Sequence, residues 1–500
     1  MDTLDLREVA ALCDDALDEA DGLSARLPIR QAGAADVERI RRLLGAPADL
    51  RVRRIGKAVR AVYLETIVDP RRLDDEVVRP FSRALLRSGE RPSAPPGFEA
   101  VRTYGEAADA LLAGKAVVIL AGADGAWVWD VARWPQRQPQ EPPAELVSQG
   151  PHLGFVEDLA TNLALLRKEV PSRRMRVETL AIGRRSRTRV AVVYVQGLAR
   201  LDLLTEVRRR LSHVEADFIT DSGMLSQWLV PRSYLFPAVH TTERPDVAAS
   251  AVLEGRVIIL CDGSPTIVIV PQVFADILHV PEDYYIRPLG ATIERTIRFM
   301  GFLTALVVSP LYVALLTVNL QLVPTPLFLS IAQARSNVPI PVAAEVLLLE
   351  ILVEVIRQAG LRVPSSLGQS VSIIGAIVIG QSAVIAGLFS APAVVVVSLS
   401  FIVSFIVPSR DAAMALRLLR FPLILLAAAF GLFGMMWGLM LLLIYLCAID
   451  SFGVPYLAPV SPRRLRGLQD VLWRRPLPAM RRSFLARPPR PQAAGGRKGP

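Results

Sequence analysis

Cysteine and histidine are scarce in this chain of 500 residues. The three cysteines, Cys13, Cys261 and Cys447, lie far apart, and the four histidines do not share a metal-ligand spacing. The sequence therefore predicts neither a metal site nor a disulfide framework, and we expect structural or surface roles for the histidines. Isolated cysteines of this kind are typical of a reducing compartment.

Sequence signals of catalysis and of secretion are also missing. Gly114-Lys115 follows a predicted helix and precedes a predicted strand, which is the wrong order for a phosphate-binding loop. No nucleophile–base pair stands out, so we expect no enzyme activity and no cofactor. The start of the chain, MDTLDLREVAALCDDALDEADG, is acidic and holds no long apolar run, so we expect no signal peptide and a cytoplasmic soluble part.

Charge is unevenly distributed along the chain. Residues 1–290 carry charges throughout, residues 297–448 are almost wholly apolar, and residues 463–500 are basic with Asp470 as their one acidic residue. The basic tail follows an apolar run directly, which favours anionic lipid headgroups over nucleic acid as its partner. Its many prolines predict disorder.

The soluble part contains an internal repeat. ALLAGKAVVILAGADGAWVWD (110–130) and AVLEGRVIILCDGSPTIVIV (251–270) each end a helix at a glycine, continue as a β-branched strand and turn at Asp-Gly. Upstream, residues 57–73 and 189–204 share a strand that leads into an amphipathic helix. We therefore predict two related α/β subdomains.

The fold class expected is an α/β soluble module of two related subdomains followed by an all-α polytopic membrane domain. The predicted domains are an N-terminal extension (1–35), a first α/β subdomain (36–145), a second α/β subdomain (150–285), a transmembrane helical domain (290–450) and a basic disordered tail (460–500).

Residues 296–318 are long enough to cross a bilayer about 30 Å thick. The further candidate spans are residues 341–360, 367–389, 392–407 and 421–448, and the last is either one long helix or a tight hairpin about Gly431 and Gly434. Residues 327–341 are too polar to face lipid, and we interpret them as interfacial or re-entrant. Arg417 and Arg420 are interpreted as positive charges on the inner side of the membrane. We expect four to six spans.

One apolar segment, PVAAEVLLLEILVEVIRQAG (341–360), carries three glutamates and an arginine. A charge at the centre of a membrane helix costs roughly 2.5–3.5 kcal/mol on insertion scales. At about 100° per residue, Glu350, Glu354 and Arg357 share one face of the helix and Glu345 lies roughly opposite. Two interpretations stay open. One is an interfacial helix with a local Glu354–Arg357 ion pair. The other is a cation path lined by carboxylates around an oligomer axis.

The segment that follows supplies further candidates. The residues predicted to share the ion path are Glu345, Glu350, Glu354, Gln369, Ser372 and Gln381. Small residues at helical spacing let helices approach closely. Those predicted to serve subunit packing are Gly375, Ala376, Gly380 and Gly387.

Several long motifs resemble the GerA family of spore germination proteins. GPHLGFVEDLATNLALLRKEV (150–170) is similar to a signature segment of that family, and LVPTPLFLSIAQARSNVPIP (322–341) and FGVPYLAP (452–459) are similar to A subunits. The residues identified with the family signature are Gly150, Pro151, Phe155, Glu157, Asp158 and Asn162. The resemblance covers about residues 60–465. It departs after Gly-Pro, where the family has a basic–acidic pair and this chain has His152-Leu153.

The resemblance implies an A subunit of a germinant receptor in the inner spore membrane, with its soluble module on the cytoplasmic (core) side. Family A subunits join B and C subunits, form homo-oligomers thought to be pentamers and conduct monovalent cations once nutrients are sensed. By position, the resemblance places Glu350, Glu354 and Glu345 near the conduction path. Membrane lipids are expected partners and nucleic acid is not. Three alternatives stay open: a SpoVAF-like amplifying channel subunit, a secondary transporter, and a structural scaffold for a permease-like sensor subunit.

Overall fold

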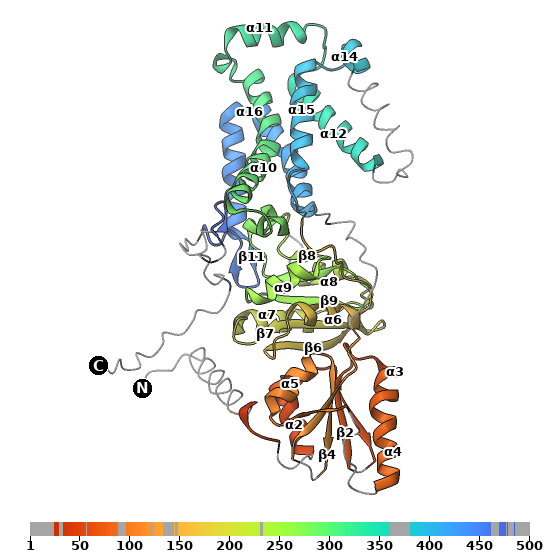
Figure 1. Ribbon diagram of the computed structural model, residues 1–500. Coiled ribbons are helices and arrows are strands. Elements are labelled where there is room, and N and C mark those ends of the chain that lie inside the picture. Colours follow the sequence, from red (N-terminus) through yellow and green to blue (C-terminus); the bar gives the residue numbers. More distant parts are fainter. Residues whose placement is uncertain are drawn as a thin grey trace, which may run out of the picture. The chain divides into compact units, whose positions relative to one another are not determined.

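A computed structural model describes the arrangement of most of the chain (Figure 1). The described residues are 25–29, 34–56, 58–88, 97–121, 124–133, 145, 149–230, 234–360, 381–461, 470–476, 478 and 485. They belong to two compact units. Unit 1 takes in Met1–Arg232, Val239–Pro271 and Arg482–Pro500, and unit 2 takes in Ser233–Ala238 and Gln272–Arg481.

Unit 1 is built on two five-stranded antiparallel sheets with equivalent topology (Figure 1). The strand orders are β1-β2-β4-β5-β3 and β6-β7-β9-β10-β8. Strands β6 to β10 therefore occupy the same positions in the second sheet as β1 to β5 occupy in the first. Each sheet lies among helices. Two related α/β subdomains, as predicted from the repeat, are therefore confirmed.

The two subdomains have the following elements. The first contains α2 (Ala34–Leu43), β1 (Leu50–Ile55), β2 (Val59–Leu64), α3 (Pro70–Arg72), η1 (Leu73–Val78), α4 (Arg79–Ser88), β3 (Glu99–Val101), α5 (Tyr104–Leu112), β4 (Lys115–Leu120) and β5 (Ala126–Asp130). The second contains α6 (Leu159–Glu169), β6 (Met175–Ile182), β7 (Thr188–Val195), α7 (Leu201–Ser212), α8 (Ser222–Leu229), β8 (His240–Thr242), α9 (Pro245–Leu253), β9 (Val257–Cys261) and β10 (Ile267–Val270).

Glycines shape the two repeated hairpins. Helices α5 and α9 are each followed by a glycine in the left-handed region, Gly114 at φ 81° and Gly255 at φ 89°. The β4–β5 and β9–β10 turns contain Gly125 at φ 98° and Gly263 at φ 88°. Glycine adopts such angles without the steric cost that a Cβ brings. The turn positions predicted from Asp-Gly are therefore confirmed.

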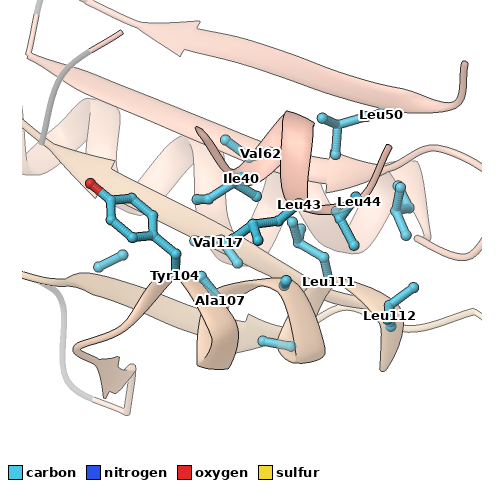
Figure 2. Packing of buried hydrophobic residues seen from close by; sticks show 14 of the residues in the cluster. Ile40, Leu43, Leu44, Leu50, Val62, Tyr104, Ala107, Leu111, Leu112 and Val117 are labelled. Atoms are coloured by element: carbon cyan, nitrogen blue, oxygen red, sulfur yellow. The ribbon is translucent and has the colours of Figure 1, made fainter. Parts of the chain in front are cut away.

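One core layer of the first subdomain lies between its sheet and the pair α2 and α5 (Figure 2), and a second includes Leu73 and Val77 of η1 and Phe81 of α4. Apolar side chains at helical spacing, Ile40 and Leu43 of α2 and Leu111 of α5 among them, pack against Val62 and Val117 of the sheet. Helix α5 begins with a capping box between Thr103 and Glu106, which satisfies free N–H groups of its first turn. The second subdomain repeats this layer with α6 and α9.

Unit 2 is mainly helical, and four of its helices share one apolar core. Its elements are η2 (Phe274–Leu278), η3 (Pro281–Tyr284), α10 (Pro288–Thr317), η4 (Leu320–Leu322), α11 (Thr325–Ala334), α12 (Val342–Gly360), α14 (Ala383–Ile385), α15 (Ala391–Ser404), α16 (Arg410–Ala448), β11 (Asp450–Ser451) and β12 (Val454–Pro455). Val313 of α10, Val346 of α12, Val397 of α15 and Ile424 of α16 meet in that core.

Two helices of the described chain are long and apolar enough to cross a membrane, α10 and α16. The second folds back on itself at Gly431, whose φ of 63° and ψ of −143° are not helical. A Cβ at Gly438 would lie 2.4 Å from Leu423 Cδ2, whereas fifteen positions of a straight helix span about 22 Å. The hairpin, one of the two forms predicted for this run, is therefore confirmed.

Gly431 is expected to tolerate no side chain. A Cβ there would lie 2.1 Å from Asn319 Oδ1, and the backbone conformation itself disfavours L-residues. We predict that Gly431→Ala lowers the free energy of unfolding by about 2–3 kcal/mol. The measurement is the thermal unfolding midpoint of the detergent-purified chain. Gly360→Ala is the control, since a Cβ at Gly360 meets no atom of the described residues within 4 Å, and equal midpoints for the two variants would contradict the prediction.

Candidate functional site

Glu350 of α12 joins four helices of unit 2. Its carboxylate is buried, and Oε1 accepts a hydrogen bond from Ser309 Oγ of α10 at 2.7 Å. Oε2 lies 3.0 Å from Nη1 of Arg420 on α16. Arg420 is 1% exposed and also donates to the carbonyl oxygen of Ser400 on α15 at 3.3 Å. One ion pair therefore connects α10, α12, α15 and α16.

Glu354, one turn further along α12, also contacts the part of α16 that precedes the bend at Gly431. Its Oε2 lies 3.4 Å from Nε of Arg417. Arg357 on its own helix also donates to it, from Nε at 3.0 Å. The pairs Glu350–Arg420 and Glu354–Arg417 run in opposite directions along the two helices, and we call them the charge zipper. The predicted polar face of α12 thus points at α16 of the same chain.

Glu345 belongs to a separate contact at the start of α12. Its side chain is fully buried and forms an ion pair with Arg335, the residue that ends α11. Its Oε1 accepts a hydrogen bond from the backbone N–H of Ser390 at 2.6 Å, and Ser390 is the N-cap of α15. A negative charge is favoured at this end of a helix. Glu345 therefore fixes the α11–α12 corner to the first turn of α15.

These pairs explain how three carboxylates are tolerated among apolar helices. An isolated buried charge is costly, so buried charges in proteins are paired and hydrogen-bonded. Each of the three glutamates meets an arginine. Such pairs add little stability compared with apolar packing, but removing one partner is strongly destabilising. They therefore specify which helices lie together.

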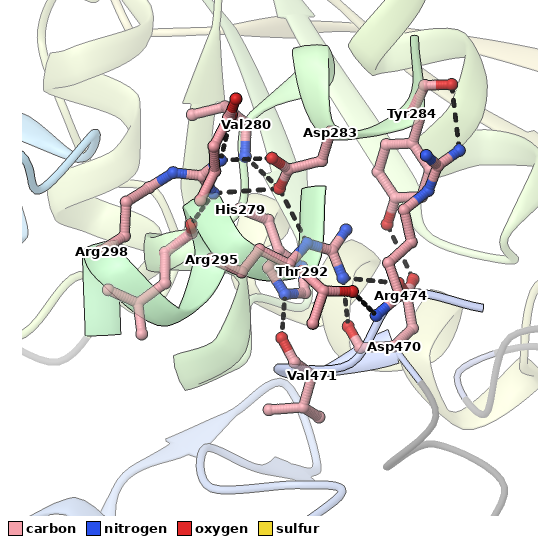
Figure 3. Close-up of polar contacts among 12 residues, drawn as sticks. His279, Val280, Asp283, Tyr284, Thr292, Arg295, Arg298, Asp470, Val471 and Arg474 are labelled. Atoms are coloured by element: carbon pink, nitrogen blue, oxygen red, sulfur yellow. Dashed lines mark hydrogen bonds and ion pairs between the residues drawn. The ribbon is translucent and has the colours of Figure 1, made fainter. Parts of the chain in front are cut away.

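A second buried ionic cluster surrounds the start of α10 (Figure 3). Asp283 of η3 is fully buried, and Oδ2 accepts hydrogen bonds from Arg295 Nε at 2.8 Å and Arg298 Nη1 at 3.0 Å. Arg298 also donates to the carbonyl oxygen of Leu278 at 2.7 Å. Burial raises the pKa of Asp283, but the hydrogen bonds from Arg298 and Arg295 outweigh it, so the pKa lies below its ordinary value.

Residues 470–476 complete this cluster. Asp470 Oδ1 lies 2.7 Å from Arg295 Nη1, and Arg474, 3% exposed, donates to the carbonyl oxygen of Tyr284 at 3.1 Å. The His279 ring lies 2.9 Å from the carbonyl oxygen of Val471. Burial, then the charge of Arg295, lowers the pKa of His279. This stretch differs from the disordered tail expected for 460–500, because Arg474 and Asp470 find buried partners.

Three of the signature residues order the start of α6. Asn162 is fully buried, accepts a hydrogen bond from Val156 N at 2.8 Å and donates to Val156 O. Asp158 caps the helix by accepting from Thr161 N at 2.8 Å. Phe155 is buried in the core of the second subdomain. Asp158 and Asn162 therefore order the N-terminus of α6, and Phe155 packs in the core of the second subdomain.

The other three signature residues connect this segment to its neighbours. Gly150 has a φ of 121°. The carbonyl oxygen of Pro151 accepts a hydrogen bond from Arg244 Nη2 at 2.9 Å. That of Glu157 accepts from Gly263 N at 2.8 Å, in the β9–β10 turn. The signature therefore holds the entry of α6 against the β8–α9 and β9–β10 loops.

The remaining predicted residues are only partly described. Gln381 is exposed. Gly387 has a φ of 69°, and a Cβ there would lie 3.0 Å from the carbonyl oxygen of Asn337. The predicted residues that lie outside the described part of the chain are Gln369, Ser372, Gly375, Ala376 and Gly380. Their assignment to the ion path and to subunit packing stays a prediction.

Sequence reasoning missed the basic partners of the glutamates. The charge pattern predicts Arg417 and Arg420 to be inner-side charges, but Arg420 is buried at the centre of the helical unit. The spacing of these arginines is compatible with an antiparallel pairing, but it does not identify the partner, which depends on how α12 and α16 pack. Arg335 and Ser309 carried no signal in the sequence.

The described residues bring together no group of three or more His, Cys, Asp or Glu side chains able to hold a metal ion. The arrangement offers fixed charges inside an apolar helical unit. Ionisable side chains in such surroundings typically face a bundle interior or a water-filled path and mark routes for ions or protons.

Comparison with known proteins points to one family. The chain matches the family described as Bacillus/Clostridium GerA spore germination protein over residues 38–484. It is 33% identical over 458 residues to spore germination protein KA of Bacillus subtilis (strain 168), covering 89% of this chain and 84% of that protein. It is 35% identical over 379 residues to stage V sporulation protein AF of the same organism, covering 75% and 76%.

Among solved structures, the chain is similar to the N-terminal domain of the A subunit of the Bacillus megaterium spore germinant receptor GerK3. Identity is 21%, the match covers 50% of this chain and 98% of that one, and the TM-score is 0.39. The family match at residues 38–484 takes in both α/β subdomains and the helical unit. The resemblance seen in the motifs is thereby confirmed, and the chain belongs to the GerA family of spore germination proteins.

Proposed function

We propose that this chain is the A-type subunit of a spore germinant receptor and that copies of it form a cation channel in the inner spore membrane. The observation that carries the proposal is Glu350, a buried carboxylate among apolar helices in the described part of unit 2. Glu354 extends the line of negative charge along the same helix face. Carboxylates at such positions attract cations when they line an aqueous path.

The contact between the tail and α10 supports a topology. Asp470 bonds to Arg295 at the start of α10, so the segment after α16 and the entry to the first long apolar helix lie on the same side of the membrane. The hairpin at Gly431 accounts for this, because it returns the chain to the side from which α16 began. We place both on the cytoplasmic side, with the soluble module, in a multi-pass membrane protein.

The assembly proposed is a homo-oligomer, with a pentamer as the family precedent, joined by B and C subunits. A permease-like subunit would sense the nutrient, and this chain would release monovalent cations in response. The proposal includes no enzyme activity and no cofactor.

The test is potassium release from spores after addition of nutrients. We compare the native chain with Glu350→Gln/Glu354→Gln at equal membrane levels, and we expect release to fall at least about tenfold because the path loses its fixed negative charge. Glu294→Gln, an exposed carboxylate of α10, is the control and should release potassium normally. Normal release from the double variant would remove the α12 carboxylates from the path.

A second candidate is the amplifying subgroup of the family. The 35% identity to stage V sporulation protein AF, whose name places it in sporulation rather than germination, keeps it as the alternative, beside relatives named spore germination proteins at 36–37%. The two candidates differ in one measurement. In spores that carry this chain as their one A-type subunit, nutrient-triggered release supports the receptor, whereas release that needs another receptor supports the amplifier.

A further inference from the structure

The charge zipper closes the proposed path in the described structure. Both oxygens of Glu350 are occupied, Oε1 by Ser309 Oγ at 2.7 Å and Oε2 by Arg420 Nη1 at 3.0 Å. A passing cation therefore finds no free carboxylate oxygen there. It finds a guanidinium that repels it.

Helix α12 turns Glu350 away from its exposed surface. Glu350 is buried, while Leu348, Ile351 and Val355 are 46%, 49% and 59% exposed. These three positions lie about 100–160° around the helix from Glu350. The surface that α12 offers to lipid or to another copy is therefore largely apolar, although the Glu354 side chain is 39% exposed, and Glu350 has to be released from α16 before it can line a path.

Arg420 is an incompletely satisfied partner. Its Nη1 and Nη2 reach Glu350 and Ser400, but its Nε is buried with no hydrogen-bond partner among the described residues. An unpaired buried N–H carries a free-energy cost. The paired arrangement of α12 and α16 therefore contains an unsatisfied buried N–H of Arg420. The cost of this group lowers the free energy needed to separate the two helices.

The outer pair of the zipper has an alternative partner already in place. Glu354 contacts Arg417 on α16 at 3.4 Å and also Arg357 on α12, from Nε at 3.0 Å. If α12 leaves α16, Arg357 keeps Glu354 neutralised. Separation can therefore start at Glu354 without leaving that carboxylate unpaired, which leaves Glu350–Arg420 as the pair that decides whether the helices stay together.

The geometry points to Arg420 as the gating residue of this chain: its ion pair with Glu350 holds α12 against α16, and parting of the pair exposes Glu350 to monovalent cations. This inference rests on the proposed function, since it assigns the regulation of the same path. Arg420 acts on the ion through Glu350 and through the position of α12.

The test is potassium retention by spores without nutrients. Arg420→Gln, in the full chain with its receptor partners, is expected to leak potassium at least about tenfold faster than the native chain, because removing one partner of a buried pair strongly destabilises the closed arrangement. Glu350→Gln/Arg420→Gln removes both charges and is expected to return the leak toward the native level. Arg410→Gln is the matched control, an exposed arginine at the start of the same helix, and should not leak.

The outcomes separate the two hypotheses. If the native chain releases potassium on nutrient addition while Arg420→Gln leaks no faster than native at rest, the gating role is overturned and the channel stands. If neither the native chain nor any variant passes potassium, the channel itself fails. Should Arg420→Gln be missing from the membrane, Arg420→Lys decides: it keeps the charge but not the geometry that reaches Ser400 as well, and we expect an intermediate leak. A native-like resting level in that variant would also overturn the gating role.

Discussion

Replacing Asp283 by asparagine is expected to lower the free energy of unfolding by about 3–5 kcal/mol. The substitution keeps the shape of the side chain but removes the negative charge that Arg295 and Arg298 share. Both arginines are nearly fully buried, so water cannot solvate the positive charges that lose their carboxylate partner. The measurement is thermal and chemical unfolding of the detergent-purified full chain.

The matched control breaks a second, exposed ion pair of Arg298. Glu294 lies 3.5 Å from Arg298 but is 52% exposed, and exposed pairs contribute about 0–1 kcal/mol. Glu294→Gln should therefore unfold almost as the native chain does. A loss of stability that is similar in both variants would show that burial of Asp283 does not set its contribution.

The pKa of Asp283 gives this prediction a pH dependence. A carboxylate whose pKa is lowered by folding stabilises the folded state above its unfolded pKa, and this contribution is lost as pH falls through the folded pKa. The stability difference between the native chain and Asp283→Asn should therefore be constant near neutral pH. It should shrink below about pH 4, the ordinary value for aspartate.

The predictable parts of the fold are those encoded by nearby residues. The Asp-Gly turns and the helix ends at Gly114 and Gly255 follow from backbone conformations that glycine adopts, so the repeat could be recognised directly. The edge strands could not. Strand β1, LRVRRI, buries only its two ends, and β3 has three residues. Strand β1 alternates apolar and basic residues over only its first four positions and β3 is too short for a periodic pattern, so the sequence carried little signal for them.

The candidate site shows the same limit. Helical periodicity predicted that Glu350 and Glu354 share a face, and in the structure both meet α16. It could not predict the partner, because Arg420 lies 70 residues away in sequence and the pairing depends on how the helices pack. The same holds for Asp470, the lone acid of the predicted disordered tail, which pairs with Arg295 across 175 residues.

The second large effect is expected where the two α/β subdomains meet. Asp49, just before β1, and Arg167 of α6 form a buried ion pair, with Arg167 Nη2 2.7 Å from Asp49 Oδ1. Thr66 donates to the other oxygen at 2.6 Å. Arg167→Met removes the positive charge and leaves the Asp49 carboxylate buried with one neutral hydrogen bond. We expect a loss of about 3–5 kcal/mol in the free energy of unfolding.

Two further variants separate the ion pair from its surroundings. Asp109→Asn breaks the exposed pair with Arg173, which also connects the subdomains, and should change stability by less than about 1 kcal/mol. Asp49→Leu/Arg167→Met replaces both charges by apolar groups. It should recover most of the loss, because an apolar replacement of a whole buried pair is often neutral.

Hydrogen exchange of the full chain then shows what the pair does for the soluble module. If Asp49–Arg167 holds the subdomains as one cooperative block, Arg167→Met should raise exchange together in the segment before β1 and in α6, although these lie in different subdomains. A rise confined to α6 would mean that each subdomain opens alone. In that case the second subdomain, whose last strand β10 is followed by the start of unit 2 at Gln272, would open without the first.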